Sequence, residues 1–172
     1  MMQQTVWRNG LLSGGLNVVY MWFLWFKNQG TPNFENGMLF GYLAMAVSLS
    51  FIFIGVWQLK KKLDTPLYFG RAFLAGLFIA LISSVLYATS WLLVNHYLYP
   101  TYMQDYMAFE LKQFKEAGVA QADIDAMAKE MMGYAKLYEN PFWAFAITIS
   151  EILPVGFIFS LAAALIFKES KR

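Results

Sequence analysis

The chain has 172 residues, of which 59% are hydrophobic, 19% are aromatic and 14% are charged. Soluble globular chains carry roughly 45–50% apolar and about 25% charged residues, so this composition excludes an ordinary soluble domain and favours a membrane protein. The chain has no cysteine, which excludes disulfides, thiolate metal sites and cysteine nucleophiles. Its single histidine, His96, argues against a histidine-rich metal site or a Ser-His-Asp triad.

Four apolar segments are each long enough to cross roughly 30 Å of hydrocarbon. The first has bulky aromatic residues where a signal peptide would have a small-residue cleavage site, so we expect it to be retained. All six tryptophans fall near segment ends, as an interfacial aromatic belt predicts. We therefore expect an all-α polytopic membrane protein, a single domain over 1–172 with four transmembrane helices. The predicted spans cover about residues 7–26, 38–59, 68–97 and 141–167.

The only extended polar section, residues 101–139, lies between the third and fourth spans and predicts a helical hairpin. Gly118 is expected to cap its first helix, and Asn140 with Pro141 is expected to begin the fourth span. Apolar residues at three- and four-residue steps predict the seam that closes the hairpin. The seam residues are Met103, Met107, Leu111 and Phe114 on the first helix and Ile124, Met127, Met131, Tyr134 and Tyr138 on the second.

Basic residues are distributed unevenly between the two ends of the predicted bundle. The end with both termini and the loop after the second span has eight basic and two acidic residues, whereas the hairpin end has five basic and eight acidic residues. The positive-inside rule therefore places both termini in the cytoplasm and the hairpin outside, in agreement with an even number of spans. The basic residues at the first end are Arg8, Lys60, Lys61, Lys62, Arg71, Lys168, Lys171 and Arg172.

Small residues recur every four positions along the third span and predict a face for close helix packing in lipid. Gly10 and Gly14 repeat this spacing in the first span. Packing within one chain is the favoured interpretation, and contact with a second copy or another membrane protein is the alternative. The stripe consists of Ala72, Gly76, Ala80, Ser84 and Ala88.

With these features the chain resembles the domain-of-unknown-function family 4199, a group of short membrane proteins of the Bacteroidota. The resemblance rests on "KKKLDTPLYFGRAFLAGLFIALISSVLYATSW", on "ENPF" before the fourth span, and on "SEILPVGFIFSLAAALIFK" within it. It implies a four-span protein of a bacterial inner membrane with its hairpin in the periplasm. It implies no mechanism, because no activity is established for the family.

The fourth span contains one carboxylate, Glu151, three residues before Pro154. A charged group at the centre of a span costs about 2.5–3.5 kcal/mol, so this acid is a candidate functional residue. Pro154 has no N–H and crowds the carbonyl of Ser150, which leaves a backbone acceptor beside the acid. The favoured interpretation is a protonated acid that hydrogen-bonds to other helices; the alternatives are a proton or ion site, or contact with a partner or lipid headgroup. Polar residues expected at comparable depth are Asn17, Ser48, Ser50, Ser83 and Ser84.

Arg71 lies at the entry of the third span, close in sequence to Lys60, Lys61 and Lys62. This cluster predicts either an anionic headgroup site or, as the simpler interpretation, side chains that fix the topology. It is too small and too close to the membrane to indicate a nucleic-acid partner. The sequence has no glycine-rich phosphate loop, zinc spacing or paired catalytic carboxylates, so we expect no catalytic residue, metal or cofactor.

Three classes of function follow from these features. A non-enzymatic accessory, scaffold or assembly subunit is favoured, because the hairpin has methionine and aromatic side chains beyond its own seam. The alternative is a small proton- or ion-coupled transporter or channel centred on Glu151. An enzyme that acts on lipids is weakest, because no acid–base pair is visible. Expected partners are the lipid bilayer and a second copy or membrane protein that contacts residues 101–139 or the small-residue stripe.

Overall fold

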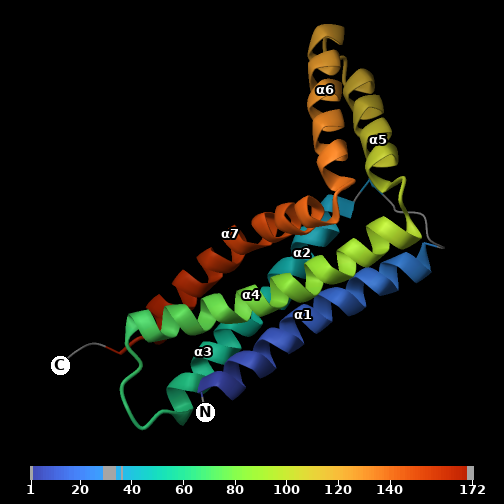
Figure 1. Cartoon of the computed structure of the whole chain (residues 1–172). Coiled ribbons are helices and arrows are strands. Elements are labelled where there is room, and N and C mark those ends of the chain that lie inside the picture. Colours follow the sequence, from blue (N-terminus) through green and yellow to red (C-terminus); the bar gives the residue numbers. More distant parts are fainter. Residues whose placement is uncertain (1, 29–33, 36, 170–172) are drawn as a thin grey trace.

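The computed structural model describes residues 2–28, 34–35 and 37–169, and within these ranges the chain forms helices and no β-strand (Figure 1). The all-α prediction is therefore confirmed. Lys171 and Arg172, counted above at the basic end, lie outside the described residues. The helices are α1 (Met2–Lys27), α2 (Gly37–Leu49), α3 (Phe51–Lys62), α4 (Phe69–Leu93), the π-helix η1 (Val94–Leu98), α5 (Tyr102–Glu116), α6 (Gln121–Tyr138) and α7 (Pro141–Phe167).

Among the described residues, three helical segments are long and apolar enough to cross a membrane. Leu39–Lys62 joins α2 and α3 across a short break, Phe69–Leu98 joins α4 and η1, and Pro141–Phe167 is α7. They have 24, 30 and 27 residues, and at about 1.5 Å per residue each exceeds the hydrocarbon thickness. The structure thus supports three of the four predicted spans clearly. α1 is not among these segments, because its asparagines, glycines and serine lower its mean hydropathy.

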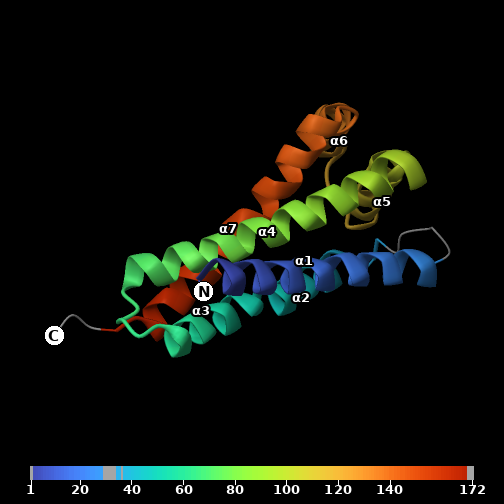
Figure 2. The same ribbon diagram turned by 60° about the horizontal axis from the view of Figure 1, so that its bottom comes forward.

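α4 is the central helix, and it packs against α1, α3 and α7 (Figures 1 and 2). The glycines of α1 allow a close approach to it. A Cβ added to Gly10 would lie 2.8 Å from Cβ of Ile82, and one added to Gly14 would lie 2.7 Å from Cδ1 of Leu86. The glycine pair predicted from the sequence therefore packs against α4 of the same chain.

The small-residue stripe of α4 lies against α3 and α7. Ala72 and Ala80 are completely buried, and a Cβ added to Gly76 would lie 3.0 Å from side-chain atoms of both Ile52 and Ser160. On the facing helix, a Cβ added to Gly156 would lie 2.6 Å from Cβ of Ala80. Small side chains thus let the backbones of α4 and α7 approach within a single chain.

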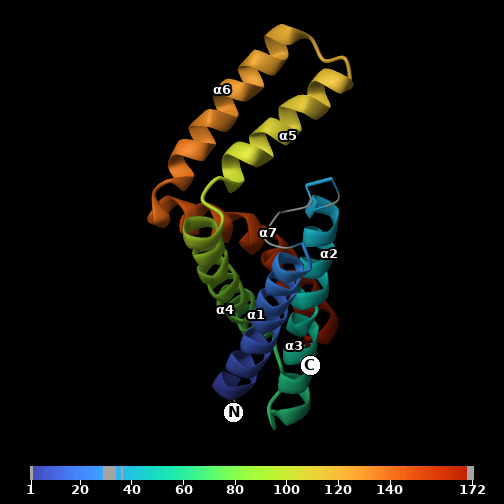
Figure 3. The ribbon, with the colours of Figure 1, turned by 90° about the vertical axis from the view of Figure 1, so that its right-hand side faces the viewer.

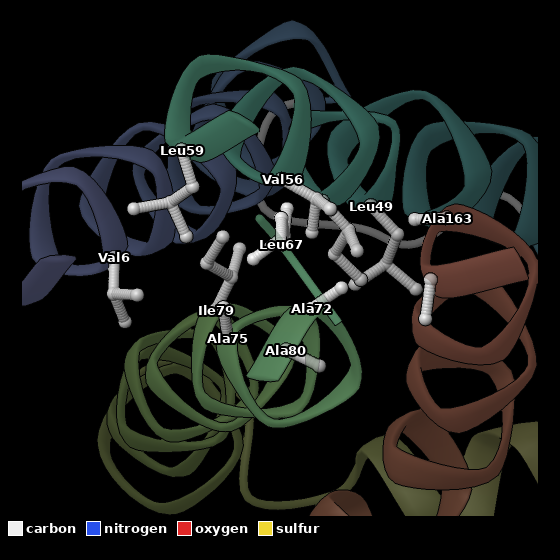
Figure 4. Close-up of a cluster of buried hydrophobic side chains, with 12 residues drawn as sticks. Val6, Leu49, Val56, Leu59, Leu67, Ala72, Ala75, Ile79, Ala80 and Ala163 are labelled. Carbon is white, nitrogen blue, oxygen red and sulfur yellow. The ribbon is translucent and has the colours of Figure 1, made fainter. Parts of the chain in front are cut away.

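Buried apolar side chains gather in the half of the bundle that holds the N-terminus (Figure 4). They come from the first turns of α1, from the end of α2 through α3, from the first half of α4 and from the last turns of α7. Phe53 of α3 packs edge-on against Phe159 of α7, with ring centroids 5.8 Å apart. Among the largest fully buried side chains are Leu49, Ile52, Leu59, Leu67 and Ile79.

α5 and α6 pack together as a hairpin that projects from the opposite end of the bundle (Figure 3). Gly118 has a φ of 75°, which an L side chain adopts with strain. Its amide donates to the carbonyl of Lys115, and the amide of Val119 donates to the carbonyl of Phe114. These two bonds form the C-terminal cap predicted at Gly118.

The predicted seam on α6 is wrong at two positions. Met127 and Tyr134 are 37% and 51% exposed, so they lie beside the contact with α5 rather than in it. The packed face starts at Ile124 and advances by alternating steps of four and three residues, which keeps a helix aligned with its neighbour. The less exposed positions are Ile124, Ala128, Met131, Ala135 and Tyr138.

The described N-terminus, the α3–α4 loop and the end of α7 lie at one end of the bundle, opposite the hairpin (Figure 1). The amide of Glu169 donates to the carbonyl of Leu67, which ties the end of the chain to that loop. At the hairpin end, Oδ1 of Asn140 accepts from the amide of Phe142, and Pro141 occupies the first turn of α7. The predicted start of this helix is confirmed.

Gly156→Ala is expected to lower the melting temperature of the protein, because its Cβ would meet Cβ of Ala80 where neither atom moves without a helix shift. The expected cost is roughly 1–3 kcal/mol. The matched control is Gly15→Ala in α1, whose Cβ would meet no atom within 4 Å and which gains helix propensity. Thermal unfolding in one detergent measures both variants, and equal melting temperatures would contradict the close approach of α7 to α4.

Candidate functional site

α1 turns a continuous polar face towards α3 and α4. Apart from Val6, which joins the apolar core, its most exposed apolar side chains lie on the opposite face, where Val19 is 66% and Phe26 is 72% exposed. This arrangement is the reverse of a surface helix in a soluble protein. The buried polar residues recur every four positions, and each is at most 4% exposed: Thr5, Asn9, Ser13 and Asn17.

Near the start of α1, this face hydrogen-bonds to α3. Nδ2 of Asn9 donates to the carbonyl oxygen of Thr5 at 2.8 Å and to Oε1 of Gln58 at 2.9 Å. Nη2 of Arg8 donates to the same Gln58 oxygen at 2.6 Å. Gln58 therefore joins the two helices at the end of the bundle that carries the basic residues.

Serines continue the polar contact deeper in the bundle. Oγ of Ser13 lies 2.8 Å from the carbonyl oxygen of Ser48 and 2.9 Å from Oγ of Ser83. Because a hydroxyl has one proton, Ser13 donates to the carbonyl and accepts from Ser83. Nδ2 of Asn17 donates to Oγ of Ser48 at 2.6 Å. In the described part of the chain, no buried side-chain nitrogen or oxygen lacks a partner.

Glu151 lies outside this network. It occupies the exposed face of α7, together with Ser150 and Pro154. Thr148 and Ile152 form the buried face of the same helix, with exposed fractions of 2% and 1%. Because an α-helix has 3.6 residues per turn, burial of these two residues leaves the carboxylate beside, and not on, the face of α7 that packs against α4.

The other serines predicted at this depth bond within their own segments. Oγ of Ser84 donates to the carbonyl of Ala80, and Oγ of Ser150 donates to the carbonyl of Ile147. Ser50 donates to a carbonyl one turn earlier, at the break between α2 and α3. The structure thus joins Asn17 to Ser83 through Ser13 and Ser48, and no described residue hydrogen-bonds or pairs with Glu151.

Tyrosines, rather than the predicted serines and asparagine, lie within electrostatic reach of Glu151. Tyr87 of α4 lies within electrostatic reach of both Glu151 and Tyr138. Burial raises the pKa of Tyr102, Tyr106 and Tyr138, and the charge of Glu151 adds to this effect in all three. Sequence reasoning missed these residues because tyrosines are expected in any interfacial belt. Tyr102, Tyr106 and Tyr138 flank the third and fourth spans on the hairpin side, whereas Tyr87 lies within the third span.

Aromatic rings connect the hairpin to the bundle at the same level. Tyr102 of α5 packs edge-on against Trp91 of α4, with ring centroids 4.7 Å apart. Phe34, between α1 and α2, lies 5.5 Å from the ring of Tyr102 and 5.7 Å from that of Tyr106. The base of the hairpin is thus fixed by ring contacts to α4 and to the segment before α2.

The first turn of α5 is fixed by an acid. The hydroxyls of Tyr99 and Thr101 donate to Oδ2 of Asp105 at 2.7 and 2.9 Å. These bonds lower the pKa of Asp105, and the bond to Asp105 raises the pKa of Tyr99. The carboxylate also lies at the helix N-terminus, where a negative charge is favourable.

The basic cluster flanks the α3–α4 loop and takes part in local contacts. Nζ of Lys61 lies 4.0 Å from the ring centroid of Trp57, and Nη1 of Arg71 donates to Oγ1 of Thr65 at 3.4 Å. Lys60, Lys61 and Lys62 form the last turn of α3, where positive charge complements the helix dipole. Within the described residues, no group of three or more histidine, aspartate or glutamate side chains is arranged to hold a metal ion.

The family model described as "Protein of unknown function (DUF4199)" matches residues 8–169. The chain therefore belongs to this family, and the resemblance noted in its sequence is confirmed. No curated protein and no solved structure matches the chain. The family is described without an activity, so the roles of Glu151, the tyrosines and the polar face rest on their geometry.

Ser13→Ala is expected to destabilise the protein by roughly 1 kcal/mol, because it removes the donor to Ser48 and the acceptor for Ser83. Ser150→Ala is the matched control, since this exposed hydroxyl bonds only to its own helix. Thermal unfolding of the two variants in one detergent measures the difference. Loss of stability in Ser150→Ala alone would contradict the assignment of Ser13 to the interior network.

Proposed function

We propose that the protein is a four-span integral membrane protein of a bacterial inner membrane, with α1 as the fourth span. The 26 residues of α1 extend about 39 Å, enough to cross the hydrocarbon. The strongest support is the orientation of its side chains, because polar groups face other helices and apolar groups face outwards. That pattern suits lipid, where an exposed asparagine would have no water to hydrogen-bond.

Both termini lie in the cytoplasm and the α5–α6 hairpin lies in the periplasm in this proposal. Arg8, Arg71, Lys168 and the lysines that end α3 support it, because they fall at one end of the bundle and satisfy the positive-inside rule there. The four crossings also return the chain to the side where it began. The family resemblance supports a source among the Bacteroidota.

The protein acts as a non-enzymatic accessory or assembly subunit that contacts a membrane-protein partner through the hairpin. The observation that carries this proposal is an exposed apolar stripe on α6, beside its packed face. Met127, Tyr134 and Leu137 of the stripe are 37%, 51% and 42% exposed, and Met132 is 54% exposed. Methionine and tyrosine are common at adaptable contact surfaces.

A small proton- or ion-coupled transporter centred on Glu151 is the second candidate. The observation that favours it is the exposed carboxylate on α7, next to a carbonyl that Pro154 leaves without its helical donor. Acids and broken helices of this kind hold protons or cations in several transporter folds. No enzymatic activity is proposed, because no acid–base pair accompanies Glu151.

Single-cysteine labelling tests the topology, and the chain has no native cysteine to interfere. We expect Lys27→Cys and Asp123→Cys to react with an impermeant maleimide applied from the periplasm, whereas Gln4→Cys and Asp64→Cys do not. This result follows from α1 crossing the membrane between Gln4 and Lys27. Labelling of both α1 positions from the same side would overturn the fourth span.

The double variant Tyr134→Ser with Leu137→Ser tests the accessory role. We expect it to reduce the recovery of a cross-linked membrane partner by about fivefold or more, because two exposed apolar contacts are removed. Gln113→Ser, at an exposed polar position of α5, is the matched control. Unchanged cross-linking, together with loss of proton or cation flux into liposomes in Glu151→Gln, would favour the transporter instead.

A further inference from the structure

Three membrane-length segments of the described chain have an end on the same side of the bundle, away from the hairpin (Figure 1). Leu39–Lys62 and Pro141–Phe167 finish there, and Phe69–Leu98 begins there. Six described bases and two described acids, Asp64 and Glu169, lie at this end, and no described base there is ion-paired with either acid. Positive charge is therefore in excess at the level where the hydrocarbon stops and lipid headgroups begin. The bases are Arg8, Lys60, Lys61, Lys62, Arg71 and Lys168.

Lys168 directly follows α7, and its backbone is fixed against the start of α4. Its amide donates to the carbonyl of Ala164 at 3.0 Å, and the amide of Glu169 donates to the carbonyl of Leu67 at 2.9 Å. Nζ of Lys168 lies 6.0 Å from the ring centroid of Phe69, the first residue of α4. The side chain is exposed, and no hydrogen bond or ion pair to a described residue occupies its ammonium. An accessible cation is thus held between the ends of two spans.

An apolar face of α4 and α7 extends from Lys168 into the membrane-length part of the bundle. The rings of Phe69 and Phe73 stack with centroids 5.9 Å apart, and Phe73 packs edge-on against Phe157 of α7 at 5.3 Å. Phe69 and Phe157 are 37% and 48% exposed. Lys168 lies eleven residues after Phe157, which is close to three helical turns, so both side chains lie on one face of α7. The exposed side chains between them on this face are Leu161 and Leu165.

We infer that this face binds an anionic phospholipid, with the lipid phosphate on the ammonium of Lys168 and an acyl chain along Phe69, Phe73 and Phe157. An ammonium and a phosphate form a charge-assisted hydrogen bond. Eleven residues of α7 extend about 16 Å, which is close to half of the roughly 30 Å of hydrocarbon and so matches the chains of one leaflet. The other bases attract anionic lipids to this end of the protein.

An anionic phospholipid fits better than a zwitterionic one, because a choline or ethanolamine group would add positive charge where bases already exceed acids. A phosphate without acyl chains would gain nothing from the exposed rings. The inference requires that α4 and α7 cross the membrane. It does not require α1 to be the fourth span or the hairpin to bind a partner, so it and the proposed function can fail independently.

Competition between phosphatidylglycerol and phosphatidylcholine with identical dioleoyl chains tests the site. The delipidated full-length protein in neutral detergent receives both lipids in equal amounts, and native mass spectrometry counts the lipid retained. We expect the wild type to retain phosphatidylglycerol over phosphatidylcholine by about tenfold or more. Lys168→Gln should lower this ratio about fivefold, because it removes the cation that contacts the phosphate, whereas Lys168→Arg should keep the ratio.

Lys61→Gln is the matched control. It removes the same charge from the same end, but the ammonium of Lys61 lies over the Trp57 ring of its own helix, 4.0 Å from the centroid. We expect this variant to keep the ratio within about twofold of the wild type. Equal losses in Lys61→Gln and Lys168→Gln would show attraction by net charge alone and would overturn the site.

Two further outcomes would contradict the proposal. Equal retention of the two lipids by the wild type would exclude an anionic headgroup site. Displacement of phosphatidylglycerol by glycerol phosphate, which is its headgroup without acyl chains, would assign the cation to a soluble phosphate and overturn the lipid occupant.

Discussion

The hydrogen bonds between the polar face of α1 and its neighbours are the constraint on which the rest of the structure depends. In hydrocarbon, a polar side chain without a partner costs more than it does in water, so Asn9, Ser13 and Asn17 require partners from other helices. They find them in Gln58, Ser48 and Ser83. In the four-span proposal, α1 is therefore suited to lipid only as part of the bundle, and its composition alone would not mark it as a span.

The bundle packs different kinds of side chain at its two ends. Glycine and alanine bring α4 and α7 together at Ala80 and Gly156, and α3 closes the core behind them. Towards the hairpin, buried small residues such as Ala88 of α4 and Ala144 of α7 continue, and rings at the base of α5 add aromatic contacts. Tyr102 and Phe34 hold this end together through aromatic contacts. The apolar core thus lies in one half of the bundle, and small and aromatic residues pack the other half.

Much of the fold could be predicted from the sequence because membrane length, helix caps and small-residue spacing act locally. Gly118, Asn140 and the alanines of α4 behave as their local patterns predict. The candidate site could not be predicted from the sequence, because the position of a residue in a span gives its depth but not the direction in which its side chain points. Glu151 and Asn17 were expected to meet at one depth, yet α7 buries Thr148 and turns the carboxylate towards tyrosines that the sequence places far apart.

The two proposed surfaces of the protein are physically connected. Tyr138 ends α6 within reach of Glu151, and Tyr102 begins α5 beside Trp91, so the site and the hairpin share their boundary residues. A shift of the hairpin base would therefore change the surroundings of Glu151 as well. Tyr134 of the exposed stripe lies about one turn before Tyr138 on the same helix. If the proposed partner binds the stripe and a proton or ion binds Glu151 as in the second candidate function, any coupling between the two events is the same free energy in both directions.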